Sequence, residues 1–353
     1  MKNNKLFKFG VIALSIVLVA CAGGSSDEAG CPVIEDRKIN VVATTPMVGE
    51  FVSQVGGDNI NLTVIMPPEA DPHTYEPAPQ DAGTIADADL VFYTGLKYEP
   101  AAVIKLLESS ACSTEVLAEV GENVFPIEFK EGGHDDHGDH DDHDEEGHDD
   151  EEGHDDEEGH DDEEGHDDHD GHEGHGHGAY DPHFWFDPNR VAYATEYIES
   201  KLVEFDPSNA SSYETAGSAY TDELKGLTGQ VSDLISTVPS QNRKLITTHE
   251  SLGYLEAKFG LEVLSTIIPS LDSANEISPA QLVDVIDVIE DNNVKVIFIE
   301  AEAPSVYAET IVAETGIKAV EGLWVETLKE GQSYPDFLIS AVELIVENLR
   351  NTD

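Results

Sequence analysis

The sequence predicts an α/β protein with two Rossmann-like lobes, each built on a parallel sheet, joined by one long rigid helix. Short β-branched runs alternate with helical segments before residue 110 and again after residue 240. This alternation is typical of parallel sheets covered by helices. Between the two regions, apolar residues recur every three or four positions over ~30 residues, which predicts an amphipathic helix roughly 45 Å long. A helix of that length exceeds one lobe, so we expect it to join two.

The first lobe is expected at residues 38–205. Strands are predicted where apolar, β-branched residues form short runs, at residues 39–45, 61–66 and 90–94. Helices are predicted at residues 48–55, 80–88, 100–109 and 188–204. The last of these helices follows Asp187-Pro188, in which the aspartate is a suitable N-cap and the proline suits the first helical position.

The joining helix is expected at residues 206–239 and the second lobe at residues 240–353. Asp206-Pro207 repeats the helix-start signal. The apolar positions of the helix are Tyr213, Ala216, Tyr220, Leu224, Leu227, Val231, Leu234 and Val238. In the second lobe, strands are predicted at residues 244–248, 263–267, 294–300 and 318–320, and helices at residues 251–259, 279–292, 305–315 and 334–349.

The chain is strongly acidic, with 73 Asp and Glu residues against 18 Lys and Arg residues and a formal net charge of -55. The segment 134–177 carries 24 of these acidic residues, so the rest of the chain is acidic as well. A polyanion would be repelled by this charge, which argues against nucleic acid as a partner. Cations would be attracted.

A tract of His, Asp, Glu and Gly lies within residues 132–178. It contains no apolar side chain that could offset the entropy of ordering, so we expect a disordered insertion in the first lobe. Its histidines are expected to bind zinc weakly at several sites; a merely solvating acidic loop is the alternative. They are His134, His137, His140, His143, His148, His154, His160, His166, His169, His172, His175 and His177.

The N-terminus has the pattern of an exported lipoprotein. Basic residues precede a short apolar run that ends at Leu-Val-Ala-Cys, so we expect a signal peptide at residues 1–20, lipid on Cys21 and a flexible tether at residues 21–37. The apolar run is short for a membrane span; an uncleaved anchor or an ordinary signal peptide is the alternative. The mature protein would then be anchored by lipid at the outer face of the cell membrane or in the periplasm.

Two cysteines remain once Cys21 is assigned to lipid. In an oxidising compartment, Cys31 and Cys112 could form one disulfide. Two unpaired buried thiols are the alternative.

Three histidines lie outside the tract, and all three occupy comparable loop positions. His73 and His183 end two Asp-Pro-His triplets, and His249 follows the predicted strand 244–248. His73 likewise comes soon after a predicted strand, at the end of a sheet where open α/β proteins bind ligands. A hydrogen-bonded loop residue is the plain interpretation of each histidine alone. Together they predict a zinc site, with one coordination position left for a carboxylate or water.

Five segments resemble the substrate-binding lipoproteins of zinc and manganese ABC transporters. They are VATTP at 42–46, PPEADPHTYEP at 67–77, ADLVFYTGL at 88–96, HFWFDP at 183–188 and HESLGY at 249–254. The resemblance extends from about residue 39 to residue 349, apart from the tract. It implies two lobes joined by a single long helix, a metal buried between them, and a membrane permease as partner.

The resemblance also implies the ligand set His73, His183 and His249. A histidine at the third position and a His-rich acidic loop are typical of the zinc branch, whereas the manganese branch usually has glutamate there. The family's fourth ligand is usually an aspartate in a Leu-Asp-Pro-Leu setting after the last strand. The corresponding stretch here, residues 320–323, has Glu321, so either Glu321 or water is expected as the fourth ligand.

Glu300 ends a predicted strand and is a candidate to accept the second N–H of a metal-bound imidazole; a salt-bridged loop acid is the alternative. The expected function is therefore zinc capture for an ABC importer by a monomer that is not an enzyme. Manganese or iron binding and a metal-binding surface adhesin are alternatives. A zinc hydrolase is disfavoured because a His-Glu-x-x-His motif starting at His249 would need histidine at Gly253.

Overall fold

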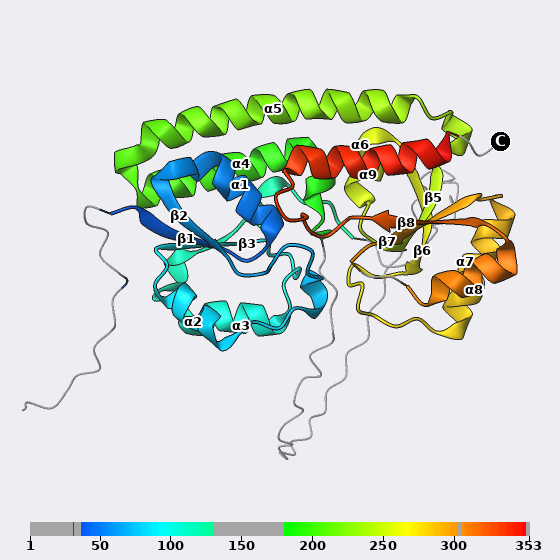
Figure 1. The fold of residues 1–353 in the computed structure, drawn as a ribbon, viewed down its shortest axis with the longest axis horizontal. Coiled ribbons are helices and arrows are strands. Elements are labelled where there is room, and N and C mark those ends of the chain that lie inside the picture. The colour runs from blue at the N-terminus through cyan, green and yellow to red at the C-terminus, as the bar shows by residue number, and fades with distance from the viewer. Residues whose placement is uncertain (1–30, 32–36, 130–179, 303–304, 351–353) are drawn as a thin grey trace, which may run out of the picture.

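The computed structural model describes residues 31, 37–129, 180–302 and 305–350. These residues form two lobes side by side, each with a four-stranded parallel sheet flanked by helices (Figure 1). The predicted fold class is confirmed. The predicted signal peptide, Cys21, most of the predicted tether and the His-rich tract lie outside the described residues.

The first lobe contains a sheet in the order β2-β1-β3-β4. Its strands are β1 (Ile39–Ala43), β2 (Ile60–Val64), β3 (Leu90–Tyr93) and β4 (Leu117–Glu119). Helices α1 (Pro46–Gly56), α2 (Pro79–Ala86) and α3 (Ala101–Ser110) connect or follow the strands. Helix α1 begins sharply because the Thr45 side chain accepts a hydrogen bond from the Val48 amide and Pro46 follows the cap. The sequence did not predict β4, which has three residues and too little alternation to be recognised.

The second lobe repeats this design with the order β6-β5-β7-β8. Its strands are β5 (Lys244–His249), β6 (Glu262–Ile268), β7 (Val296–Glu300) and β8 (Lys318–Leu323). Its helices are α6 (Gly253–Phe259), α7 (Pro279–Asp291), α8 (Tyr307–Thr315) and α9 (Tyr334–Leu349). Strand β8 runs three residues beyond its predicted end, which changes the position at which the following loop begins.

One long helix connects the lobes, and a second helix packs against it. Helix α4 (Pro188–Phe205) packs against α5 (Ala210–Ser236), which has 27 residues and runs over both lobes (Figure 1). The buried positions of α5 recur at helical spacing: Tyr213, Gly217, Tyr220, Leu224, Leu227, Val231 and Ile235. One apolar cluster includes all of these residues except Gly217, together with residues of β1, β7 and α9. The lobes therefore share a continuous core, which restrains their relative movement.

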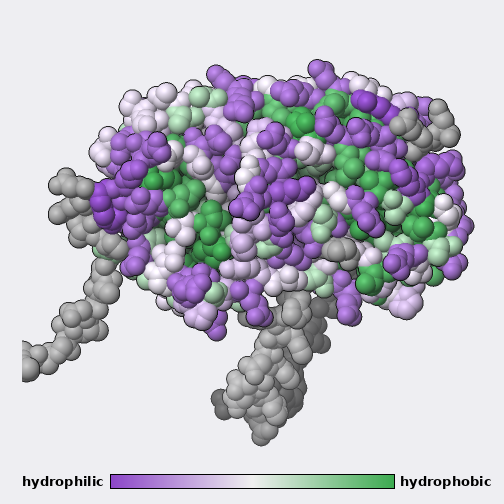
Figure 2. Space-filling view, viewed as in Figure 1, coloured by the Kyte–Doolittle hydropathy of each residue, from purple (hydrophilic) through white to green (hydrophobic). Residues whose placement is uncertain are grey.

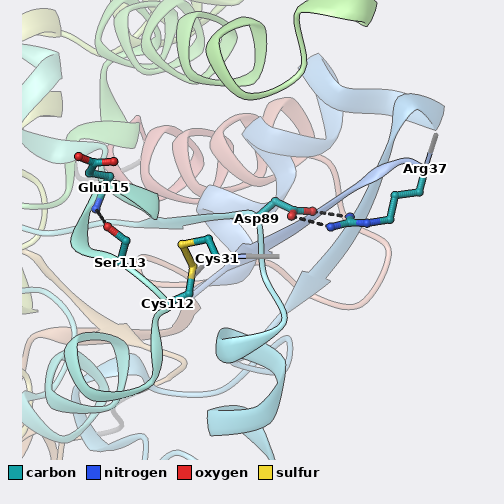
Figure 3. Close-up of a disulfide and its surroundings, with 6 residues drawn as sticks. All are labelled: Cys31, Arg37, Asp89, Cys112, Ser113 and Glu115. Atoms are coloured by element: carbon teal, nitrogen blue, oxygen red, sulfur yellow. Dashed lines mark hydrogen bonds and ion pairs between the residues drawn. A yellow bond between two sulfur atoms is a disulfide. The ribbon is translucent and has the colours of Figure 1, made fainter. Parts of the chain in front are cut away.

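A disulfide and a pair of hydrogen bonds hold the start of the first lobe in place (Figure 3). Cys31 forms a disulfide with Cys112, which follows α3 and is 81 residues away in the sequence. Arg37 makes two hydrogen bonds to Asp89, at 2.6 and 2.7 Å. These contacts attach Cys31 to the chain just after α3 and Arg37 to the residue just before β3.

Hydrophilic residues cover most of the face shown in Figure 2, and hydrophobic residues form small separate groups on it. Among the described residues, no helix has both the length and the apolar character required to cross a membrane.

Candidate metal centre

The two Asp-Pro-His triplets share one local hydrogen bond. In the first, the Asp71 side chain accepts a hydrogen bond from the His73 amide at 3.0 Å. In the second, Asp181 accepts one from the His183 amide at 2.8 Å. Proline restricts the intervening backbone in both triplets. His73 lies within the 3-10 turn Pro72–Thr74, and His183 is the N-cap of the 3-10 turn Phe184–Phe186. Both histidines belong to the first lobe.

The second lobe contributes His249 as the last residue of β5. Strand β5 is central in its sheet, with β6 on one side and β7 on the other. A side chain at the carboxyl end of such a strand faces the crevice where open α/β sheets bind ligands. His249 is completely buried.

The fourth member of the site is Glu326, and the prediction of Glu321 was wrong. Glu321 lies within β8, is exposed, and does not belong to the group. The register between β7 and β8 shifts next to Glu321, and the strand continues to Leu323. The loop that follows the last strand therefore starts later than predicted and turns Glu326 inward.

His73, His183, His249 and Glu326 each offer one ligand atom, and these atoms all lie within 4.8 Å of one another. The Nε2 atoms of the three histidines lie 3.2, 3.2 and 2.6 Å from the same Glu326 oxygen, in that order. The ring centroids are 5.3–6.4 Å apart. The exposed fraction of these side chains is 5 % for His73 and at most 1 % for the others. The group is thus enclosed between the lobes.

Buried carboxylates orient two of the rings. Nδ1 of His183 lies 2.8 Å from Asp181, and Nδ1 of His249 lies 2.5 Å from Glu300. A carboxylate at Nδ1 holds the proton there and leaves Nε2 free to bind a cation, an arrangement common around metal-bound histidines. Glu300 also accepts hydrogen bonds from the His249 amide and the Ser251 hydroxyl. Glu300 thus lies beside a candidate ligand histidine, as expected.

His73 is oriented less firmly than the other two histidines. Its Nδ1 lies 3.9 Å from Asp272, beyond hydrogen-bond distance. The Asp272 side chain belongs to the second lobe and is 47 % exposed. The His73 ring also packs edge-on against Tyr98, with centroids 5.4 Å apart. His73 is thus the ligand candidate nearest to solvent.

The buried histidines and Glu326 shift one another's pKa values. Burial opposes protonation of His183, but Glu326 and Asp181 outweigh it and raise the pKa of His183 to about 9. Burial also opposes protonation of His249, while Glu300 and Glu326 raise its pKa well above 6.5. Burial favours a neutral Glu326, yet the three imidazoles hold its pKa well below 4.5. A metal ion would therefore displace protons from the rings.

Two buried polar atoms indicate that a metal ion fits this group. Among the described residues, His249 Nε2 and Glu326 Oε2 are buried without a hydrogen-bond partner. The 2.6 Å contact between His249 Nε2 and the other Glu326 oxygen lacks hydrogen-bond geometry. Unsatisfied buried polar atoms are costly, and a cation between them would satisfy both. Three imidazole nitrogens and one carboxylate oxygen are a suitable tetrahedral donor set for Zn²⁺.

Sequence reasoning did not assign Asp181 or Glu326. Asp181 carried a signal, because it stands two residues before His183 in a triplet that repeats the one at His73. The sequence gives little indication of the role of Glu326, since that role depends on where β8 ends. In a chain with 73 acidic residues, composition does not single out one of them.

Solved structures share this fold. The periplasmic zinc binding protein TroA of Treponema pallidum superposes with a TM-score of 0.68 at 20% identity, covering 89% of this chain and 100% of that one. A crystal structure of ZnuA superposes with a TM-score of 0.66 at 23% identity, covering 89% and 100%.

Relatives match over nearly the full length. The high-affinity zinc uptake system protein ZnuA of Bacillus subtilis is 29% identical over 351 residues, which is 96% of each chain. The manganese ABC transporter substrate-binding lipoprotein PsaA of Streptococcus mitis is 27% identical over 355 residues, covering 98% of this chain and 99% of the relative. The family described as "ZnuA: Zinc-uptake complex component A periplasmic" matches residues 41–348. The chain belongs to this ZnuA family of metal-binding components of ABC transporters.

Proposed function

We propose that this protein captures Zn²⁺ between its lobes and delivers it to the membrane permease of an ABC importer. The observation that supports this proposal most strongly is the convergence of three imidazole Nε2 atoms and the Glu326 carboxylate from the two lobes. In this proposal His73, His183, His249 and Glu326 are the ligands, and zinc is the cargo.

The donor set favours zinc over manganese. Imidazole nitrogens suit Zn²⁺, whereas Mn²⁺ is better served by carboxylates, carbonyls and water. Manganese is the second candidate because several relatives are named as manganese transporter components. Because the donor set has three nitrogens and one carboxylate, its chemistry favours zinc over manganese as the cargo.

The route to the site follows from its exposure. The acidic chain attracts divalent cations from solution. His73, the least buried ligand, and Asp272 lie on the side nearest to solvent. Release requires the lobes or the Glu326 loop to move, because the other three ligand side chains are almost completely buried. The shared core limits such movement to small rearrangements.

Several features of the setting belong to the same proposal. The protein acts as a monomer held at the outer face of the membrane, or in the periplasm, by lipid on Cys21; relatives are named lipoproteins. Hydrolysis is not proposed, because Glu250 is not part of the metal group and instead accepts a hydrogen bond from Thr266.

The His-rich tract is proposed to collect zinc without being required for the tight site. The described residues on either side of it lie together: Glu128 and Tyr180 form an antiparallel bridge, and the Asp181 amide donates to the Ile127 carbonyl at 3.0 Å. Residues 133–178 can therefore be replaced by a short linker. The shortened chain should bind fewer zinc ions in total and retain one tightly bound ion. Loss of that last ion would refute the idea.

The direct test of the function is metal content and preference. The shortened chain is stripped of metal, offered zinc and manganese together, and analysed for bound elements, followed by competitive titration with a chelator. One tightly bound zinc per chain is expected. A preference for manganese would overturn the zinc assignment.

A further inference from the structure

The loop that carries Glu326 is held by side chains and not by a sheet. Strand β8 ends at Leu323, whose carbonyl accepts a hydrogen bond from the Ala301 amide at 2.8 Å. Beyond this point the described chain leaves the strand ladder, yet Val325, Glu326 and Thr327 remain at most 2 % exposed. Their backbone groups are therefore buried and require partners from elsewhere.

Glu302 supplies partners for the amides. A single oxygen of its carboxylate accepts hydrogen bonds from the Val325, Glu326 and Thr327 amides, at 3.0, 3.0 and 3.3 Å. Glu302 lies two residues beyond the end of β7, the neighbour of β8 in the sheet. Its side chain thus takes the place of the carbonyls that a longer β7 would have offered.

The first lobe supplies partners for the carbonyls of the same loop. The Trp185 indole donates to the Val325 carbonyl at 2.8 Å, and the Tyr98 hydroxyl donates to the Glu326 carbonyl at 2.9 Å. The amides are thus held from the second lobe and the carbonyls from the first. Trp185 and Tyr98 also pack around the histidines, so changing them would disturb several contacts. Glu302 is the cleaner probe of the loop.

We propose that Glu302 is a positioning residue that sets whether Glu326 reaches the metal. This inference rests on the proposed function, since it deepens the role of the fourth ligand. Without the Glu302 acceptor, three buried amides lose their partner, and the loop would move towards water to satisfy them. Glu326 would move with it, because its own amide is the middle one of the three. The three histidines lie on other elements and would stay in place.

Two conservative variants distinguish the role of the Glu302 acceptor oxygen from the role of its negative charge. Glu302→Gln keeps side-chain length and one acceptor oxygen but has no ionisable group. Glu302→Asp keeps the carboxylate but is one methylene shorter, so its oxygen is withdrawn from the loop. Zinc affinity of the full chain is measured by chelator competition, and Co²⁺ absorption reports the ligand set. Glu321→Ala, an exposed change on β8, is the matched control.

Glu302→Asp should lower zinc affinity ~10–100-fold, as loss of an outer partner typically does. It should also shift the Co²⁺ spectrum towards that of Glu326→Ala, whereas Glu302→Gln should stay close to the unchanged protein. In the Glu326→Ala background, Glu302→Asp should cause no further loss, because the two changes act through one ligand. A residue that merely stabilises the lobe would lower the unfolding temperature and act additively.

Each contrary result has a distinct meaning. If the unchanged protein fails to bind zinc tightly, the proposed function is refuted and this inference with it. If the unchanged protein binds zinc but Glu302→Asp keeps full affinity, the inference alone is refuted. The inference is also refuted if Glu302→Gln loses affinity while Glu302→Asp does not, because the charge would then be the cause. Losses that add in the Glu326→Ala background would refute it as well.

Discussion

Nε2 of His249 lies 2.6 Å from a carboxylate oxygen of Glu326, although His249 ends β5 and Glu326 follows β8 in the second sheet. Strand β7 separates β5 from β8 in that sheet, so the contact is made beyond the strand ends. The first lobe places His73 and His183 against the same oxygen. Each lobe thus provides half of the candidate ligand set, and neither can form the site alone.

Replacing Glu326, the proposed fourth ligand, should weaken zinc binding more than replacing the nearby exposed Glu321. Glu326→Ala should lower zinc affinity by at least the ~10–100-fold that loss of an outer partner costs, about 1.4–2.8 kcal/mol. Glu321→Ala should leave affinity unchanged, because its side chain lies on β8 outside the group. Chelator competition measures both. Equal losses would show that Glu326 is not the fourth ligand.

The carboxylates that face the Nδ1 atoms of His249 and His73 should contribute unequally to zinc affinity. Glu300→Gln removes the charged acceptor 2.5 Å from His249 Nδ1 and should lower zinc affinity ~10–100-fold. Asp272→Asn should have a smaller effect, because Asp272 is half exposed and 3.9 Å from His73. The same competition assay compares them. A larger loss for Asp272→Asn would mean that His73 is the more tightly oriented ring.

Much of the fold could be predicted because its signals are local. The β-branched runs, the Asp-Pro helix starts and the spacing of apolar residues in α5 are each contained within a short window of sequence. The three candidate ligand histidines could also be predicted, since they are the only histidines outside the tract. Glu326 could not be predicted in this way. Its place depends on the register shift between β7 and β8, which is a property of two strands and cannot be read from one.

Lower pH should weaken zinc binding. In the metal-free protein the pKa of His183 is raised to about 9, mainly because the carboxylates of Glu326 and Asp181 outweigh burial, and the pKa of His249 is raised as well. Zinc binds the neutral rings, so each proton present must leave on binding. Affinity should therefore fall as pH decreases below about 9, by roughly tenfold per pH unit for each proton displaced.

Titration calorimetry in buffers of different ionisation enthalpy measures the protons released. At pH 7 we expect at least one proton to be released per zinc bound. Binding that releases none, with an affinity independent of pH between 6 and 8, would show that the rings are neutral before the metal arrives.

Loss of the disulfide should destabilise the protein without affecting the metal site. Cys31→Ser with Cys112→Ser should lower the free energy of unfolding by about 2–5 kcal/mol, since the bond joins residues 81 positions apart. Denaturant unfolding of the metal-free protein measures this change. Zinc affinity should not change, because neither cysteine belongs to the metal group. An unchanged unfolding midpoint would indicate that Arg37 and Asp89 alone fasten the segment before β1.

X-ray absorption at the zinc edge of the loaded protein, with residues 133–178 removed, tests the account most directly. Four ligands at ~2.0–2.2 Å are expected, with the outer-shell scattering of three imidazoles and a single oxygen donor that is lost or altered in Glu326→Ala. A six-coordinate shell dominated by oxygen, or a shell with fewer than three imidazoles, would contradict it.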